Sequence, residues 1–256
     1  MTSGRAPSLP TAYRLVALER ADSTNDTARE LAQGGAEDGT LVWAAEQTKG
    51  RGRQGRAWAS PPGNLYCSLV LRPDCPLARA SELSFLAALA VGGAVGGLVP
   101  PLTDLRYKWP NDVLLNERKV AGILLESAAK PDGALDFLVL GVGVNIVSSP
   151  KDAAFPASSM REEGGEAVEV ADVLESFAKH LMTWVDRWLD EGFAPVRAAW
   201  LRRAWRLGEQ LQVGLEGETA AGRFRGLGAD GTLELELAGG AVRRIAAGDV
   251  RLARAG

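Results

Sequence analysis

Hydrophobic and polar positions follow two different patterns in the first 206 residues. Short segments are alternating or continuously apolar and are bounded by Gly, Pro or Asn, which is typical of β-strands. Longer segments are apolar throughout or have apolar residues three and four positions apart, which is typical of helices. The expected strands lie at 13–18, 41–47, 64–72, 113–115, 119–126 and 136–146, and the expected helices at 27–32, 78–99, 172–188 and 195–206. The mixture predicts an α+β fold with a central mixed β-sheet and helices.

The pattern changes at about residue 208. Five short β-runs follow, and glycine-containing turns separate them. Such a succession is typical of small antiparallel barrels. We therefore divide the chain into a first domain at 1–206 and a C-terminal SH3-like β-barrel at 207–256.

Local signals refine two of these segments. Lys130-Pro131-Asp132-Gly133 predicts a tight turn. Asp172 and Glu175 have the spacing of a capping box at the start of a helix. The single histidine, His180, lies outside that helix's apolar stripe, so we expect it to be exposed. The stripe itself predicts core packing and consists of Leu174, Phe177, Leu181, Trp184, Val185 and Trp188.

Composition and charge narrow the classes of function. The formal net charge is -3 over 256 residues, whereas a general nucleic-acid binder is more often basic. Cys67 and Cys75 make neither a disulfide framework nor a metal motif, and Cys67 is expected to be a buried thiol. The N-terminus lacks the apolar core of a signal peptide, and the apolar run at 85–102 is too short to span a bilayer. We expect a cytoplasmic protein with no membrane partner.

A basic, glycine-rich loop connects two of the predicted strands. Gly50-Arg51-Gly52-Arg53-Gln54-Gly55-Arg56 alternates flexible backbone with guanidinium groups, and Trp58 follows. Glycine allows close approach of a ligand to the main chain, and arginine suits carboxylate and phosphate oxygens. The segment is therefore either a solvated surface loop or a loop that closes over an anion.

Two further segments carry polar groups beyond what their turns require. Asp22-Ser23-Thr24-Asn25 could cap the helix that follows or could bind a polar ligand group at its N-terminus. Lys108-Trp109-Pro110-Asn111-Asp112 could be a solvated turn, with Lys119 an ordinary hairpin lysine. Alternatively, Asp112 could bind Mg²⁺ and a lysine could hold phosphate.

Neither loop matches a standard phosphate motif. The glycine spacing at 50–56 is not that of a P-loop or of a dinucleotide-binding turn. We also identify no Ser/His/Asp arrangement. An anion-closing loop beside a Lys/Asn/Asp corner fits nucleotide-dependent activation of an acid, without naming the acid.

These motifs together resemble the biotin protein ligase family. The resemblance covers roughly residues 20–147 and rests on five segments in the family's order: 22–25, 47–58, 108–112, 119–126 and 141–145. It implies a class II synthetase-like catalytic domain followed by an SH3-like barrel. It also implies that biotin and ATP form biotinyl-5′-AMP and pyrophosphate. Biotin would then pass to a lysine of a biotin carboxyl carrier protein, a subunit of acetyl-CoA carboxylase.

The resemblance also assigns roles to individual residues. Lys119, Arg51 and Arg53 would be catalytic, and Asp112 would bind Mg²⁺ that accompanies ATP, with no tightly bound cofactor. Trp58 would help to close the loop, which we expect to be mobile until ligand binds. Nucleotide binding would involve Arg53, Trp58, Asn111, Lys119 and Asn145. Biotin binding would involve Ser23, Thr24, Asn25, Gln47, Gly50, Arg51, Gly52, Arg53, Lys119, Gly122, Gly141 and Gly143.

The sequence also bears on DNA binding, on the adenine contacts and on self-association. Some bacterial members carry an N-terminal DNA-binding domain, and only about 12 residues precede the first expected strand here, so we expect no DNA-binding role. No motif in 148–166 identifies the adenine contacts, and Gln54 and Arg56 have no assigned role. The alternatives are a lipoate or octanoate ligase, or a nucleic-acid or interaction module. Homodimerisation by sheet-edge pairing is a further expectation.

Overall fold

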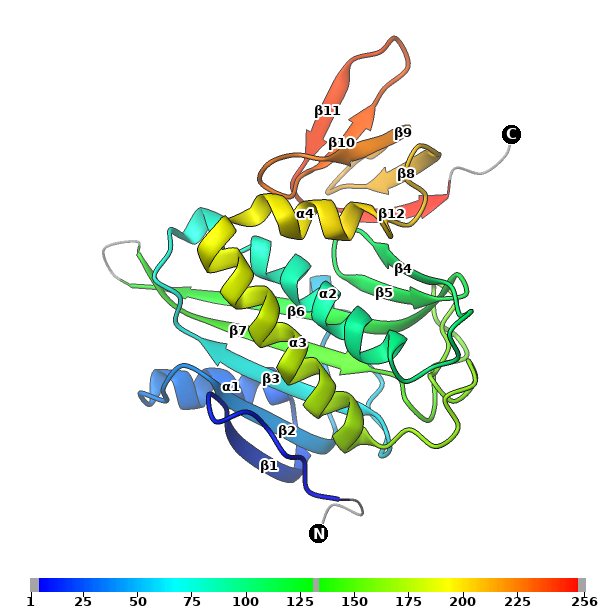
Figure 1. The fold of residues 1–256 in the computed structure, drawn as a ribbon. Helices are drawn as coiled ribbons and strands as arrows, with labels where there is room; N and C mark the ends of the chain where they lie inside the picture. Colours follow the sequence, from blue (N-terminus) through cyan, green and yellow to red (C-terminus); the bar gives the residue numbers. More distant parts are fainter. Residues whose placement is uncertain (1–4, 131–133, 253–256) are drawn as a thin grey trace.

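A seven-stranded mixed sheet forms the centre of the first domain in the computed structural model, which describes residues 5–130 and 134–252. The strand order is β1-β2-β3-β7-β6-β5-β4 (Figure 1). β1 and β2 are parallel and all other neighbours are antiparallel, so the expected mixed sheet is confirmed. The expected turn at 131–133 lies outside the described residues. The strands are β1 (Arg14–Ala21), β2 (Thr40–Gln47), β3 (Leu65–Leu71), β4 (Leu105–Lys108), β5 (Asp112–Leu115), β6 (Arg118–Ala129) and β7 (Leu135–Val144).

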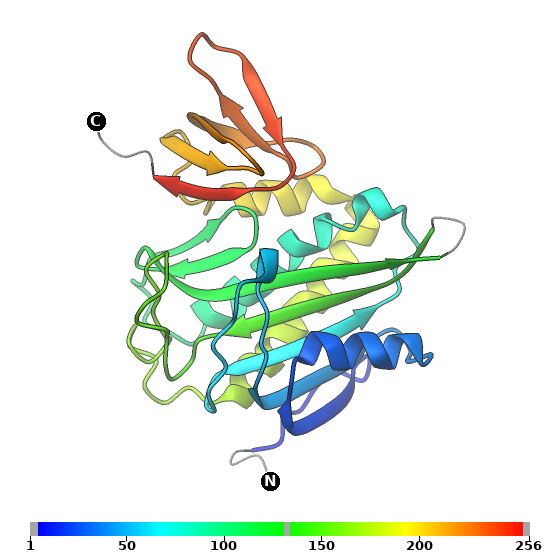
Figure 2. The ribbon, with the colours of Figure 1, turned by 180° about the vertical axis from the view of Figure 1, so that it is seen from behind.

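Helices cover the two faces of this sheet unequally. α2 (Glu82–Gly96) and α3 (Val170–Glu191) lie on one face, with α4 (Phe193–Leu201) beside them, and α1 (Thr24–Gln33) lies on the other (Figures 1 and 2). Because side chains alternate along a strand, β7 contributes to both sides. Its even-numbered residues Leu138, Leu140 and Val142 join the core under α2 and α3. Its odd-numbered residues Phe137 and Val139 pack toward α1.

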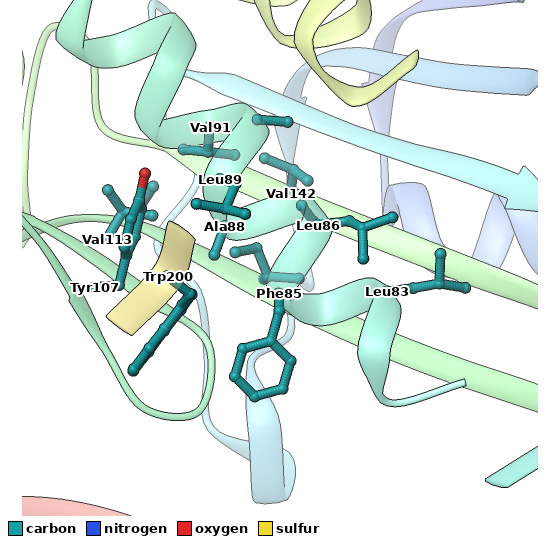
Figure 3. Packing of buried hydrophobic residues seen from close by; sticks show 14 of the residues in the cluster. Leu83, Phe85, Leu86, Ala88, Leu89, Val91, Tyr107, Val113, Val142 and Trp200 are labelled. Carbon is teal, nitrogen blue, oxygen red and sulfur yellow. The ribbon is translucent and has the colours of Figure 1, made fainter. Parts of the chain in front are cut away.

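α2 is apolar on nearly all sides, which matches its burial between the sheet, α3 and α4. Its Phe85 meets Trp200 of α4 edge-on at 5.6 Å, and Tyr107 of β4 stacks on the same indole at 6.0 Å (Figure 3). Gly92 permits this approach, since a Cβ there would lie 2.2 Å from the Tyr107 hydroxyl oxygen. The stretch Leu77–Gly96 is long and apolar enough to cross a membrane by length and composition, but most of it is buried inside this fold.

The C-terminal domain is a five-stranded antiparallel sheet of order β11-β10-β9-β8-β12. The expected small β-domain is confirmed, and within the described residues its edge strands β11 and β12 do not pair with each other. The hairpin of β10 and β11 projects outward, whereas β12 lies nearer the first domain (Figure 1). The strands are β8 (Gln210–Gly214), β9 (Thr219–Leu227), β10 (Leu233–Glu236), β11 (Val242–Ile245) and β12 (Asp249–Leu252).

Several expected element boundaries were wrong. The helix expected at 78–99 is split into a 3₁₀ turn, η2 (Leu77–Arg79), and α2, and β4 was not expected as a strand. α3 begins earlier than expected, and the backbone N–H of Glu169 donates to Asp172 at 3.2 Å. Glu175 is therefore not the capping partner. α4 begins at Phe193 and ends at Leu201, short of the expected 195–206.

His180 is half-buried rather than exposed. It packs against α2, where a Cβ at Gly93 would lie 2.3 Å from its Cδ2 atom. This burial lowers the pKa of the imidazole. The residue serves helix packing on the face of the sheet that α2 and α3 cover, away from the cavity described below.

Candidate functional site

Three glycines on neighbouring strands form a flat floor on the α1 side of the sheet. Gly141 and Gly143 continue the odd-numbered face of β7, and Gly122 of β6 is the register partner of Gly143. Side chains at these positions would collide with their neighbours. A Cβ at Gly141 would lie 2.1 Å from Asn25 Oδ1, and one at Gly143 would lie 2.6 Å from the Trp58 indole. The absence of side chains at these three positions therefore leaves space above β6 and β7 on this face of the sheet.

A cavity of about 540 Å³ lies over this floor, between the first domain and β12. Of the residues expected at the site, Asn25 and Gly50 do not line it. The structure brings the others together at its wall: Ser23, Thr24, Gln47, Arg51, Gly52, Arg53, Trp58, Asn111, Asp112, Lys119, Gly122, Gly141, Gly143 and Asn145.

The N-terminus of α1 provides a polar end to the cavity. The backbone N–H and the hydroxyl of Thr24 both donate to Gln47 Oε1, at 2.8 and 3.1 Å. The other end of the Gln47 amide donates to Ser60 Oγ at 2.9 Å. Ser23 occupies the N-cap position but its side chain makes no capping hydrogen bond, so capping does not account for this hydroxyl.

Asn25 packs against the floor at Gly141 on the α1 side, beside the cavity and not in its lining. Its Nδ2 donates to Glu126 Oε2 at 2.6 Å, and its Oδ1 accepts from Ser68 Oγ at 2.6 Å. Both partners lie on strands of the central sheet. The amide therefore fixes α1 on the sheet immediately beside Gly141.

The loop at 50–58 is folded onto itself. The Trp58 backbone N–H donates to Gly50 O at 2.9 Å, and the Gly52 N–H donates to Arg56 O at 2.6 Å. Its tip is a short 3₁₀ turn, η1 (Arg53–Gly55), in which Gly55 has a φ of +72°. Gly50 has a packing role, because a Cβ there would lie 2.5 Å from Ser60 Oγ.

The first two arginines of the loop have different surroundings. Arg51 lies on the rim, where its Nη2 contacts Asp26 at 2.5 Å and Glu126 at 3.3 Å. Arg53 lies deeper, donating to Asn111 Oδ1 at 3.4 Å and to the Gly248 carbonyl at 3.3 Å. Burial lowers the pKa of Arg53.

A buried carboxylate joins two lysines at the Lys/Asn/Asp corner. Asp112 lies 2.6 Å from Lys119 Nζ and 3.4 Å from Lys108 Nζ. Burial would raise the pKa of Asp112, but the two ammonium groups outweigh it and hold this pKa below its ordinary value. Burial lowers the pKa of Lys108 despite Asp112. The solvated-turn interpretation of Lys108 and Asp112 is therefore wrong, since both are buried.

This corner does not fit a resident Mg²⁺ site. Each oxygen of Asp112 faces a lysine. Among residues 5–130 and 134–252 there is also no group of three or more His, Cys, Asp or Glu side chains that could hold a metal. Asp112 is therefore better described as the anion that separates the ammonium groups of Lys108 and Lys119.

Two asparagines expected on the nucleotide side use their amides within the protein. Asn111 Nδ2 donates to the Ile123 carbonyl at 2.6 Å. Asn145 Nδ2 donates to the Ser158 carbonyl at 3.0 Å and so fixes the segment that follows β7. Both residues still line the cavity.

In two parts of the wall the sequence identified no individual residue. The segment after β7 contributes Pro150, Asp152, Ala153, Ala154, Phe155 and Ala157, and β12 contributes Asp249, Val250 and Arg251. The first segment is polar and irregular and carries no motif. The second is one short β-run among five, and only its packing against the first domain brings it to the site. Lys108 also lines the cavity. The sequence pointed to its segment, 108–112, but did not assign Lys108 itself to the site.

The cavity is cationic although the chain is acidic overall. Six cationic side chains and three carboxylates belong to its lining, which gives six minus three, or a formal +3, against -3 for the whole chain. They are Arg51, Arg53, Arg56, Lys108, Lys119 and Arg251, and Asp112, Asp152 and Asp249. A volume of this size suits a ligand larger than a single metabolite fragment, and the charge suits an anion.

Comparison with protein families matches both domains. Residues 9–202 match the biotin/lipoate A/B protein ligase family, and residues 207–252 match the biotin protein ligase C-terminal domain. A biotin–[acetyl-CoA-carboxylase] ligase of Paracoccus denitrificans is 43% identical over 223 residues, covering 85% of this chain and 92% of that protein. The bifunctional ligase/repressor BirA of Bacillus subtilis is 36% identical, covering 90% of this chain and 71% of that protein.

Solved structures share the whole architecture. The biotin protein ligase from Aquifex aeolicus in complex with biotin and ATP has a TM-score of 0.79 at 29% identity, covering 94% of this chain and 99% of that chain. The biotin protein ligase from Leishmania major in complex with biotinyl-5-AMP has a TM-score of 0.62 at 27% identity, covering 91% and 98%.

Proposed function

Because the chain belongs to the biotin/lipoate A/B protein ligase family, we propose that it is an ATP-dependent biotin protein ligase. It converts biotin and ATP to biotinyl-5′-AMP and pyrophosphate, and then transfers biotin to a lysine of a biotin carboxyl carrier protein. The observation that carries this proposal is a cationic cavity on a glycine floor, in a chain whose relatives are biotin ligases.

The first half-reaction joins two anions. A carboxylate oxygen of biotin attacks the α-phosphorus of ATP, and the bond from that phosphorus to the pyrophosphate oxygen breaks. At about 4 Å two unit charges repel by roughly 1 kcal/mol in water and by more in a drier site. Arg53 and Lys119 offset this repulsion and the charge that develops at the α-phosphate. Mg²⁺ enters with ATP as part of the substrate.

The polar end at α1 suits the uncharged head of biotin. The Ser23 hydroxyl, the Thr24 hydroxyl and the Gln47 amide lie together there and would hydrogen-bond the ureido group. Gly122, Gly141 and Gly143 leave room for the bicyclic ring and the valeryl chain. Arg51, Gly52 and Arg53 would close over the chain and its carboxylate.

The nucleotide lies toward the segment after β7. Phe155 and three alanines supply apolar wall there, and Lys108 Nζ lies 4.9 Å from the Phe155 ring centroid. We assign the adenine to this side because the α1 end is already polar and suits biotin. Asn111 and Asn145 shape the wall, since their amides are used within the protein.

The second half-reaction needs a dry cavity until the carrier arrives. The carrier lysine amine attacks the acyl carbon of the mixed anhydride, the bond to AMP breaks, and the amine loses a proton. A closed loop protects the anhydride from water in the interval. Mobility of this loop without ligand stays a prediction.

A transfer assay tests the proposal. The chain is incubated with biotin, MgATP and a biotin carboxyl carrier domain, and biotin on the carrier is measured by mass. A carrier whose target lysine is replaced by arginine is the matched control. Absence of biotin on the unmutated carrier would overturn the proposal.

The nearest alternative acids are lipoate and octanoate. The matched C-terminal domain favours biotin. Pyrophosphate release with each acid separates these substrates, and we expect release with biotin well above release with the others. A nucleic-acid module is a different class, and salt-dependent binding of an oligonucleotide would be its signature. The acidic net charge favours the ligase.

We also propose a homodimer and a cytoplasmic location. β1 is an edge strand of the central sheet, which would allow pairing of two copies at this edge. Sedimentation measurements with and without biotinyl-5′-AMP would test a dimer. A cytoplasmic location agrees with two cysteines that are unpaired in the structure.

A further inference from the structure

Arg56, the last residue of the glycine-arginine loop, lies in the cavity wall and contacts the other domain. Its Nη2 lies 2.8 Å from Oδ1 of Asp249, the first residue of β12. The preceding residue of the C-terminal domain, Gly248, accepts a hydrogen bond from Arg53 at 3.3 Å. Two successive residues of one domain therefore hold two arginines of the other domain's loop.

The C-terminal sheet fixes the position of Asp249. Asp249 pairs with Gly214 of β8 in the antiparallel ladder between β8 and β12. Gly248 is packed so closely that a Cβ there would lie 2.8 Å from Val213 Cγ1 and 3.0 Å from the Gly214 carbonyl. The carboxylate is thus presented to the loop by the C-terminal sheet and not by a loose tail.

The loop transmits this contact to the residues that face the ligand. The Arg56 carbonyl accepts from the Gly52 N–H at 2.6 Å, and Arg51 and Ala57 form a β-bridge. At the other end, Arg51 is held by Asp26 and Glu126 of the first domain. The loop is therefore held by side chains at two points, through Arg51 on the first domain and through Arg56 on the C-terminal domain.

We propose that the Arg56–Asp249 ion pair is a tether by which the C-terminal domain holds this loop closed over the bound adenylate. Arg56 is then a positioning residue. The inference rests on the proposed function, because it concerns retention of biotinyl-5′-AMP. The side chains are 54% and 26% exposed, so the pair is of the modest, salt-sensitive kind.

Release of the adenylate tests the tether. Labelled biotinyl-5′-AMP is formed on the enzyme, unbound ligand is removed, and its escape is followed after adding an excess of unlabelled adenylate. We expect Arg56→Ala and Asp249→Ala each to speed release by about two- to fivefold, and the double variant to add little. The exchanged pair, Arg56→Asp with Asp249→Arg, should return the rate toward that of the unmutated chain, and Arg56→Lys should retain most of the effect.

A matched control uses an exposed ion pair of the same domain. Arg243 pairs with Glu218 away from the cavity, so Arg243→Ala should leave release unchanged. Equal release from Arg56→Ala and the unmutated enzyme would overturn the tether, as would failure of the exchanged pair to slow release relative to both single variants.

Amide hydrogen exchange in the ligand-free chain tests the tether independently of enzymatic activity. Amides at 50–58 should exchange faster in Asp249→Asn than in the unmutated chain, and Arg243→Ala should not change them. Unchanged exchange in Asp249→Asn would overturn the tether. If the unmutated chain formed no adenylate, the proposed function would fail while this measurement still decided the inference.

Discussion

The indole of Trp58 lies against the backbone of Gly143, so closely that a Cβ at this glycine would come within 2.6 Å of Nε1 and Cε2. The indole N–H is buried and has no hydrogen-bond partner among the described residues. Lys119 Nζ lies 5.2 Å from the same ring, within cation–π range. The Trp58 ring, which belongs to the loop, therefore contacts both the glycine floor and Lys119.

This contact predicts the effect of Gly143→Ala. The added methyl group displaces the indole or narrows the floor, so we expect the KM for biotin to rise about tenfold, the equivalent of about 1.4 kcal/mol. Pyrophosphate release at varied biotin concentration measures it. Gly34→Ala, whose Cβ would meet only ordinary contacts at 3.4 Å, is the control. An unchanged KM in Gly143→Ala would mean that the floor does not contact biotin.

Lys119 should affect rate more than its neighbour on the same strand. Lys119→Ala removes a cation from the reacting phosphate, and loss of one such group costs about 10²- to 10³-fold in kcat. Arg118→Ala serves as the matched control, because Arg118 pairs with Glu163 at 2.6 Å and does not line the cavity. Single-turnover formation of biotinyl-5′-AMP measures both variants. Comparable rates for the two would remove Lys119 from the chemistry.

Ser68 should contribute to stability without touching substrate. It is fully buried, and its hydroxyl lies 2.6 Å from Asn25 Oδ1 and 2.8 Å from Thr24 Oγ1. Ser68→Ala leaves a buried amide oxygen without its donor, which lowers the free energy of unfolding by about 1–3 kcal/mol. Urea unfolding measures this, with the exposed Ser127→Ala as control. Equal midpoints for the two variants would contradict the network described here.

Stability should fall above about pH 9 because of the buried thiol of Cys67. Burial raises the pKa of Cys67 from 9.0 to about 12. The unfolded chain therefore loses this proton first, and the contribution is complete below pH 9 and decreases as pH rises toward 12. At pH 10 the loss from this group is about 1.4 kcal/mol. Urea unfolding at pH 8 and pH 10 should show a smaller decrease in Cys67→Ala than in the unmutated chain.

Most of the catalytic domain could be predicted from the sequence because its signals are local. The β5–β6 hairpin was expected from a polar turn between two apolar runs, and it is confirmed with Asn116 and Glu117 at positive φ. The glycines of β7 were expected at the site, and strand alternation places both on one face. β4 was missed because four residues ending in Lys108 look like a polar turn until burial is known.

The rest of the site depends on contacts between segments distant in sequence. Nothing in β12 distinguishes it from the other short strands of its domain, yet it forms one wall of the cavity. Asp112 was expected to bind Mg²⁺ beside basic residues, whereas the fold places a lysine at each of its oxygens. The SH3-like barrel was expected from short β-runs between glycine turns, and such local signals do not determine whether the edge strands β11 and β12 pair.

The position of β12 has a practical consequence for handling the protein. Val250 and Arg251 line the cavity just before β12 ends at Leu252, whereas β1 lies at the far edge of the central sheet (Figure 1). An affinity tag or surface attachment joined after β12 would therefore follow directly on a strand that forms part of the cavity wall. Immobilisation through the N-terminal side keeps the attachment away from β12, and it is the orientation suited to a biosensor or a labelling column.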